Sequence, residues 1–147
     1  MNRVSIQAED FDVAAELAVL EACGGGGVAS FTGIVRGEDG LAALELHHYP
    51  AMTTLQVERI VDDAMVRWPL LGVRVIHRHG RLEPGDRIVF VGTASRHRAA
   101  ALESCAFLID WLKSAAPFWK KEHFTDGRTG WIESRAEDEA KARDWLG

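Results

Sequence analysis

The stretch RIVFVGTASRHRAAALESCAFLIDWLKSAA, residues 87–116, decides the fold because it joins a strand pattern directly to a helix pattern. Residues 87–95 are rich in β-branched and aromatic side chains, which is typical of a strand. Residues 96–116 predict a helix that Pro117 ends, since proline cannot continue it. The helix face that we expect to be buried consists of Leu102, Ala106, Ile109 and Leu112.

The start of this helix carries the three basic residues Arg96, His97 and Arg98. A helix N-terminus already presents partial positive charge, so a cation there costs about 0.3–1 kcal/mol. The sequence leaves two interpretations open. Either the arginines extend into solvent, or an anion binds at the helix start, held by backbone N–H groups and guanidinium groups.

Outside this stretch, strand and helix patterns intermix without a strict βαβ rhythm. Strand patterns cover residues 3–7, 28–36, 41–49 and 73–80, and helix patterns cover residues 10–23 and 52–68. The sequence therefore predicts an α+β fold with a mixed or antiparallel sheet and about three main helices, in one domain spanning residues 1–147.

Two local features of these helices follow from residue type. Asp10 or Asp12 is expected to cap the first helix, and the glycines at 24–27 to form a flexible exit from it. The apolar side expected on the helix at 52–68 consists of Leu55, Ile60, Val61, Ala64 and Met65.

The composition excludes several classes of protein. The chain of 147 residues has 47% hydrophobic and 27% charged residues, as ordinary globular domains do, and no apolar run long enough to span a membrane or act as an export signal. A net charge of −5 argues against general nucleic-acid binding. Cys23 and Cys105 form no disulfide framework and are consistent with a reducing cytoplasm.

Three lysines near the end of the third helix form a second basic group. Lys113 lies in the last helical turn, where a cation is expected for dipole reasons alone. Lys120 and Lys121 follow Pro117 in a strand pattern, so their side chains point to opposite faces. Because Arg98 and Lys113 are about 22 Å apart along a helix, the two basic groups need either two sites or a second copy of the chain.

Arg36 is a third candidate, at the end of the strand pattern FTGIVR. Period-two alternation places it on the same face as Ile34, at the mouth of an apolar surface, although exposure to solvent also explains it. His77 and His79 share a strand face, but no third ligand at metal-site spacing accompanies them. The sequence contains no G-x-S-x-G motif, and Cys105 lies among apolar neighbours, so no nucleophile is evident.

Several of these stretches together resemble the large catalytic subunit family of molybdopterin synthase. In chain order they are FTGIVR, MTTLQVERIVDDAMVRW, VIHRHGRLEPGD, VFVGTASRHRAAALESC and IDWLKSAAPFWKKE, and the resemblance runs from about residue 28 to residue 135. It implies an α/β-hammerhead fold and a homodimer. Each end of the dimer would bind a small ubiquitin-like sulfur-carrier subunit, which gives a heterotetramer. The family moves sulfur from the carrier's C-terminal thiocarboxylate to cyclic pyranopterin monophosphate, building the dithiolene of molybdopterin without a cofactor or a metal in this subunit.

The resemblance also implies roles for individual residues. Lys113 and Lys120 would be catalytic, with Lys113 nearest the incoming thiocarboxylate and Lys120 the main catalytic lysine. The substrate-binding set would consist of Ile34, Val35, Arg36, His97, Arg98, Lys113, Lys120, Lys121 and Glu122. Two positions depart from the family pattern: Ile34 stands where some relatives have lysine, and His47 where glutamate is common.

A different class of function is also compatible with the basic clusters. A non-catalytic dimeric module could use them to hold a phosphorylated metabolite or the acidic tail of a partner. Simple binding does not require two lysines on either side of a turn formed by proline and aromatic residues, so the sequence favours the enzyme.

Overall fold

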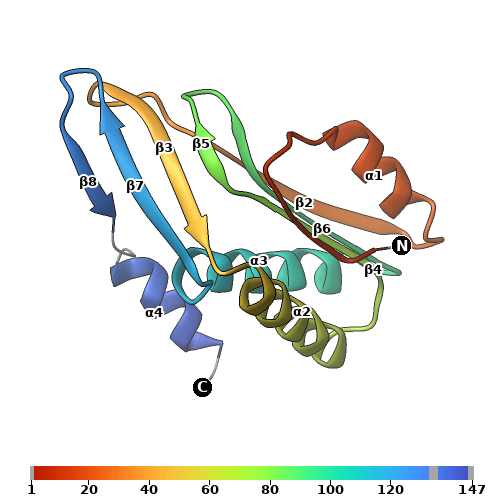
Figure 1. Ribbon diagram of the computed structural model, residues 1–147. Helices are drawn as coiled ribbons and strands as arrows, with labels where there is room; N and C mark the ends of the chain where they lie inside the picture. The colour runs from red at the N-terminus through yellow and green to blue at the C-terminus, as the bar shows by residue number, and fades with distance from the viewer. Residues whose placement is uncertain (1, 133–135, 146–147) are drawn as a thin grey trace.

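The computed structural model describes residues 2–132 and 136–145, which form two four-stranded β-sheets (Figure 1). Sheet A contains, in spatial order, β1 (Val4–Gln7), β4 (Leu70–Arg78), β6 (Arg87–Ser95) and β2 (Gly27–Ile34). Sheet B contains β5 (Gly80–Leu82), β3 (Leu41–His48), β7 (Phe118–Phe124) and β8 (Thr129–Ile132). Only β1 and β4 pair in parallel among the described strands, so the predicted α+β fold with a mixed sheet is confirmed.

The helices are α1 (Val13–Glu21), α2 (Pro50–Arg67), α3 (Arg98–Ser114) and α4 (Ala136–Asp144). The first three are the helices that the sequence predicts, and α4 is an addition. No helix within the described ranges is both long and apolar enough to cross a membrane.

Sheet A forms the centre of the hydrophobic core because helices cover both of its faces. In Figure 1, α2 and α3 lie on one side of this sheet and α1 on the other. Val75 and Val91 pack toward α2 and α3, whereas Ile76 and Phe90 pack toward α1, as strand alternation requires. A smaller cluster of Val35, Leu44, Leu46 and Leu82 joins the start of sheet B to this core.

The predicted buried face of α3 is right at two of its four positions, because Ile109 and Leu112 are partly buried and pack against the core. The other two positions are not buried. Leu102 is 60% exposed and Ala106 is also exposed. The helix instead buries Ala101, Ser104, Cys105, Phe107 and Leu108. The small side chain of Ala101 allows close approach to sheet A, where the Thr93 hydroxyl donates a hydrogen bond of 2.7 Å to the Ala101 carbonyl. Apolar spacing alone was a poor guide because α3 carries apolar residues at more than one helical repeat.

The prediction for α2 is partly right. Ile60, Val61 and Ala64 are buried, together with Thr53 and Val57. Leu55 and Met65 are 51% and 42% exposed, so the predicted apolar side is wrong at these two positions. The face that packs on the sheet is rotated toward Val57, because residues three and four positions apart share a face with it.

Gly25, Gly26 and Gly27 are packed, so they are not the flexible exit that the sequence predicts, whereas a Cβ atom on Gly24 would meet no atom within 4 Å. The Gly26 N–H donates a hydrogen bond of 3.1 Å to the Ser95 carbonyl at the end of β6. A Cβ atom on Gly25 would lie 2.3 Å from the same carbonyl oxygen, and one on Gly27 would lie 3.4 Å from the Arg98 Cα. The glycines therefore let the chain pass closely over the end of β6, and they fix where α3 begins.

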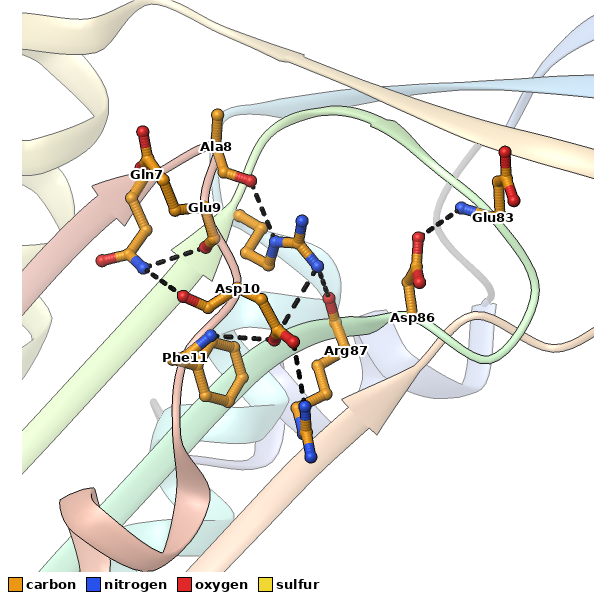
Figure 2. Close-up of polar contacts among 9 residues, drawn as sticks. Gln7, Ala8, Glu9, Asp10, Phe11, Glu83, Asp86 and Arg87 are labelled. Atoms are coloured by element: carbon orange, nitrogen blue, oxygen red, sulfur yellow. Dashed lines mark hydrogen bonds and ion pairs between the residues drawn. The ribbon is translucent and has the colours of Figure 1, made fainter.

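The segment before α1 is held against sheet A by polar contacts (Figure 2). The Asp10 carboxylate accepts a hydrogen bond of 2.9 Å from Arg87 and one of 2.8 Å from the Phe11 N–H. Asp12, rather than Asp10, caps α1 by accepting a hydrogen bond from the Ala15 N–H. Of the two predicted candidates for the cap, Asp12 therefore caps the helix, and Asp10 binds Arg87 and the Phe11 N–H.

Substitution of Gly25 by alanine tests the tight passage over β6. We expect Gly25→Ala to lower the free energy of unfolding by roughly 1–3 kcal/mol, because the new Cβ atom overlaps a backbone carbonyl that cannot move aside. Gly130→Ala is the matched control, since a Cβ atom there meets no atom within 4 Å. Urea or thermal unfolding measures both variants, and equal stability of the two would contradict the close packing of the glycine run.

Candidate active site

The end of α3 and the start of β7 bring two lysines to one small pocket. Lys113 lies in the last turn of α3, and Lys120 lies on β7. Both line a pocket of about 60 Å³ together with Phe118. The remaining lining residues are Leu112, Ser114, Ala116 and Ile132. Two positively charged residues therefore contribute to the wall of one pocket.

A tight reversal after α3 creates this arrangement. The N–H groups of Ala115 and Ala116 both donate to the Trp111 carbonyl, at 2.8 and 3.2 Å, and close the helix. Pro117 cannot continue the helix, and the Phe118 N–H donates a hydrogen bond of 2.8 Å to the Ala116 carbonyl. The chain therefore turns at once, and the start of β7 lies close to the last helical turn.

Lys120 and Lys121 point to opposite faces of β7, as predicted from strand alternation. Lys120 faces the pocket, whereas the Lys121 Nζ lies 5.6 Å from the centre of the Trp131 ring on β8. The Lys113 Nζ lies 5.9 Å from the centre of the Phe31 ring on β2. Neither Lys121 nor Glu122 is among the described residues that line the pocket.

The face of sheet B that carries Lys121 also holds an acid and two histidines. His123 and His47 lie 2.8 and 3.2 Å from the two carboxylate oxygens of Glu45. The hydrogen bond from His123 is the main reason that the pKa of Glu45 is lowered. His47, one of the two departures from the family pattern, therefore lies on the face opposite to Lys120.

Two histidines contact Phe118 at the edge of the pocket, and a third, His79, contacts one of them. The His77 ring stacks on the Phe118 ring, with centroids 3.7 Å apart and planes inclined by 15°. The His48 ring lies 5.9 Å from Phe118 and 4.5 Å from His79. Burial lowers the pKa of His48, and the nearby His79 lowers it further.

His77 is a neutral imidazole at ordinary pH. Burial lowers its pKa to about 3, and the positive charges of Lys120 and Lys113 add to that shift, although a hydrogen bond to the Arg78 carbonyl opposes it. His77 Nδ1 lies 2.8 Å from that carbonyl oxygen, which can only accept, so Nδ1 carries the ring hydrogen. The unprotonated Nε2 is then a hydrogen-bond acceptor.

The predicted anion site lies at the other end of α3. His97 is the residue that precedes the helix, it makes no capping hydrogen bond through its side chain, and both His97 and Arg98 are exposed. Fifteen helical steps of 1.5 Å separate Arg98 from Lys113, which is about 22 Å. Within one chain, the structure does not bring this basic group to the lysine pocket.

The end of β2 holds the third predicted group. β2 begins at Gly27, beside Arg98, and its residue Phe31 lies near Lys113. The strand ends at Ile34, so Arg36 lies beyond Phe31, on the side away from Arg98. The Arg36 side chain is 64% exposed and lies 3.9 Å from Glu38.

The other two residues of this group differ in exposure. Ile34 is 47% exposed, whereas Val35 is 2% exposed. The Val35 backbone is also occupied, because its N–H and carbonyl bond to Asp86 and Gly85.

A larger cavity of about 420 Å³ lies between α2, α3 and α4. Phe107, Trp111 and Trp145 form much of its wall, and it shares Ser114 with the lysine pocket. Its charged lining residues are Asp63, Arg67, Glu139 and Arg143, of both signs. Because no lysine lines it, the smaller pocket is the candidate for chemistry on an anionic group.

Sequence reasoning missed most of the pocket wall. The sequence places Phe118 only in a turn formed by proline and aromatic residues, and it offers His77 only as a possible metal ligand. The hydrophobic pattern could not show that these two rings stack, because they belong to strands of different sheets. The only available signal was the buried strand pattern around His77, which predicts a histidine without access to water.

Comparison with known proteins shows the family. The family model described as "MoaE protein" matches residues 6–115, most of the chain. This chain belongs to the MoaE family. The match includes Lys113 and ends before Lys120, but similarity to individual members continues through β7 and beyond.

Three relatives of this MoaE-family chain illustrate the similarity. The molybdopterin synthase catalytic subunit of Mesorhizobium japonicum is 53% identical over 146 residues, which cover 97% of this chain and 92% of that protein. The solved MoaE protein from Burkholderia ambifaria is 45% identical with a TM-score of 0.85, covering 100% of this chain and 99% of that one. A chain from a complex of subunits 1 and 2 of the Helicobacter pylori molybdopterin-converting factor shares the fold, at 23% identity, a TM-score of 0.74 and 90% coverage of both chains.

The buried His77 makes the stability of this MoaE-family chain sensitive to acid. The pKa falls from 6.5 in the unfolded chain to about 3 in the folded one, so below pH 6.5 only the unfolded chain binds a proton there. Stability is then lost as the pH falls from about 6.5 toward 3. Between pH 7 and pH 5 this group alone contributes a loss of about 2 kcal/mol. Urea unfolding at both pH values should show that His77→Phe loses less stability than the unsubstituted chain; equal losses would contradict a neutral buried His77.

Proposed function

We propose that this chain is the catalytic subunit of molybdopterin synthase, a sulfurtransferase of molybdenum cofactor biosynthesis. It would transfer sulfur from the C-terminal thiocarboxylate of a small carrier subunit to cyclic pyranopterin monophosphate, and two transfers would complete the dithiolene. The observation that carries the proposal is the pocket lined by both Lys113 and Lys120 in a chain that belongs to the MoaE family. The M. japonicum relative carries the name of this activity.

The chemistry of the cysteines supports a reaction in which sulfur arrives from outside the chain. Cys105 is buried, and burial raises the pKa of its thiol to about 11, so it is not a usable nucleophile. Cys23 follows α1, which packs on the side of sheet A away from α3. A carrier that delivers the thiocarboxylate needs no protein thiol, only cations that hold it.

The two lysines have separate roles in this proposal. Lys113 would hold the negatively charged thiocarboxylate through its ammonium group. Lys120 would donate or accept the proton that moves when sulfur adds to the pterin side chain. Lys121 and Glu122 would contact substrate from the rim, outside the set of residues that line the pocket in the isolated chain.

A second copy of the chain would complete the substrate site. His97 and Arg98 lie about 22 Å from Lys113 along α3, too far for one small molecule to touch both ends. A homodimer in which one copy lends these residues to the lysine pocket of the other resolves that distance. Arg36, with Ile34 and Val35 beside it, would join the site from β2, and the cations would bind the cyclic phosphate and the pterin.

The proposed assembly is a heterotetramer with one carrier subunit at each end of the dimer. The H. pylori relative with this fold is described in a complex of two subunits, which supports such a partner. Residues 1–147 would act as one catalytic-subunit domain. Both cysteines are unpaired, which supports a cytoplasmic location.

Replacement of Lys120 by alanine tests the proposed acid–base role. We expect Lys120→Ala to lower the rate of product formation by 10²–10⁴, the usual loss for a positioned proton donor or acceptor. The assay mixes the protein with thiocarboxylated carrier and cyclic pyranopterin monophosphate and detects the dithiolene product by mass spectrometry. Lys141→Ala, on the exposed side of α4, is the control and should keep the normal rate. Normal turnover by Lys120→Ala would exclude the role, and bound but unchanged ligand with the unsubstituted protein would favour a binding module.

Replacement of Arg98 by alanine tests the proposed anion site. We expect the dissociation constant for cyclic pyranopterin monophosphate to rise about 10- to 100-fold, since hydrogen bonds to a charged group are each worth about 1.5–3 kcal/mol. Arg59→Ala, exposed on α2, is the control that removes one positive charge elsewhere. Isothermal titration calorimetry measures both. Unchanged affinity in Arg98→Ala would leave the bases at 96–98 as solvated side chains.

A further inference from the structure

The ring of His77 connects the two sheets beside the lysine pocket. His77 lies near the end of β4 in sheet A and is 4% exposed, whereas Phe118 is the first residue of β7 in sheet B. Their rings are stacked at 3.7 Å. β4 and β7 belong to different sheets, so no backbone hydrogen bonds pair them. The ring stack is therefore a contact between these two strands that depends on side chains.

Phe118 transmits the position of His77 to the pocket. Phe118 and Lys120 are two residues apart on β7, so their side chains leave the same face, and both line the pocket. A shift of the Phe118 ring would move the strand from which Lys120 extends. Lys113 is anchored separately, on α3, so such a shift would change the spacing of the two ammonium groups.

An imidazole is well suited to this contact. The hydrogen bond of 2.8 Å from Nδ1 to the Arg78 carbonyl fixes the plane of the ring, which lies nearly parallel to the Phe118 ring. A positively charged side chain in this place would repel the neighbouring lysines, whereas the neutral ring adds no repulsion. Phenylalanine would keep the planar surface, and leucine would keep the apolar volume without it.

We propose that His77 is a positioning residue for Lys120: through its stack on Phe118 it holds the start of β7 and aligns the Lys120 ammonium group with Lys113 in the pocket. The inference rests on the proposed function in taking Lys120 as the catalytic lysine. His77 itself contacts no reacting atom in this role.

The kinetic test compares His77→Leu with His77→Phe in the full chain, with thiocarboxylated carrier and cyclic pyranopterin monophosphate. We expect kcat to fall at least tenfold in His77→Leu, with KM for the carrier changed less than threefold. His77→Phe should restore kcat to within threefold of the unsubstituted protein. Normal kcat in His77→Leu would overturn the proposal, and so would an equal loss in both variants, because the ring stack would then not be the reason.

Leu20→Ala controls for a general loss of stability. Leu20 is 1% exposed and packs on the opposite side of sheet A, with Phe90 and Ile76. We expect a lower Tm with kcat within threefold of normal. An equal fall of kcat in Leu20→Ala and His77→Leu would overturn the proposal, since any destabilisation would then suffice.

Phe118→Leu removes the other ring and keeps the test decisive if His77→Leu does not fold. It should reproduce the loss of kcat, and normal kcat would overturn the proposal. The double variant His77→Leu/Phe118→Leu should lose no more than the more affected single variant, because both act through one contact. If the fold losses of kcat in the two single variants multiply in the double variant, His77 does not act through Phe118, and the proposal is overturned.

A readout that needs no turnover separates this inference from the proposed function. Acetylation of lysines by an N-hydroxysuccinimide ester is followed by mass spectrometry, with Lys141 as the internal reference. We expect the relative rate at Lys120 to change at least threefold in His77→Leu and not in Leu20→Ala. An unchanged rate in His77→Leu would overturn the positioning role even if Lys120→Ala abolishes turnover. A changed rate supports the positioning role even if Lys120→Ala remains active. Activity of Lys120→Ala would exclude only the proposed catalytic role of Lys120.

Discussion

The burial of one face of α3 against β2 and β6 is the constraint on which the rest of the structure depends. The small residues Ala101 and Ser104 allow the helix to approach the sheet. The hydrogen bond from Thr93 to the Ala101 carbonyl fixes the position of the helix along β6. The glycines at 25–27 leave room for residues 95–98, where the helix begins. Once its axis is fixed, Arg98 and Lys113 are held at opposite ends of a rigid rod. For the proposed reaction, this geometry requires a second copy of the chain.

Next to the end of α3, strand β7 of sheet B presents two faces with different side chains. The turn after Ser114 places the start of β7 next to the end of the helix, and strand alternation then separates Lys120 from Lys121. The pocket face carries the paired lysines. The other face carries Glu45 with its two histidines, and Lys121 over Trp131. One strand thus supplies a cationic pocket on one side and a mixed polar surface on the other.

A neutral histidine beside two lysines explains how the pocket is supported without additional charge. Removing His77 from water suppresses its protonation, and the lysines reinforce that effect. The ring can therefore pack against Phe118 as an aromatic group while its Nδ1 satisfies a backbone carbonyl. The cost appears at low pH, where the unfolded chain binds a proton that the folded chain excludes.

The sequence by itself determined the three main helices, most of the strands, the α+β class and the family resemblance, because periodicity, proline and glycine act over a few neighbouring residues. It also predicted that Lys120 and Lys121 diverge, since alternation is a property of any strand. Only the tertiary structure decided which face of α3 is buried, that the glycines at 25–27 are packed rather than flexible, and that His77 stacks on Phe118. These features depend on contacts between segments far apart in the chain, where the fit of side chains from different elements, and not local spacing, sets the free energy.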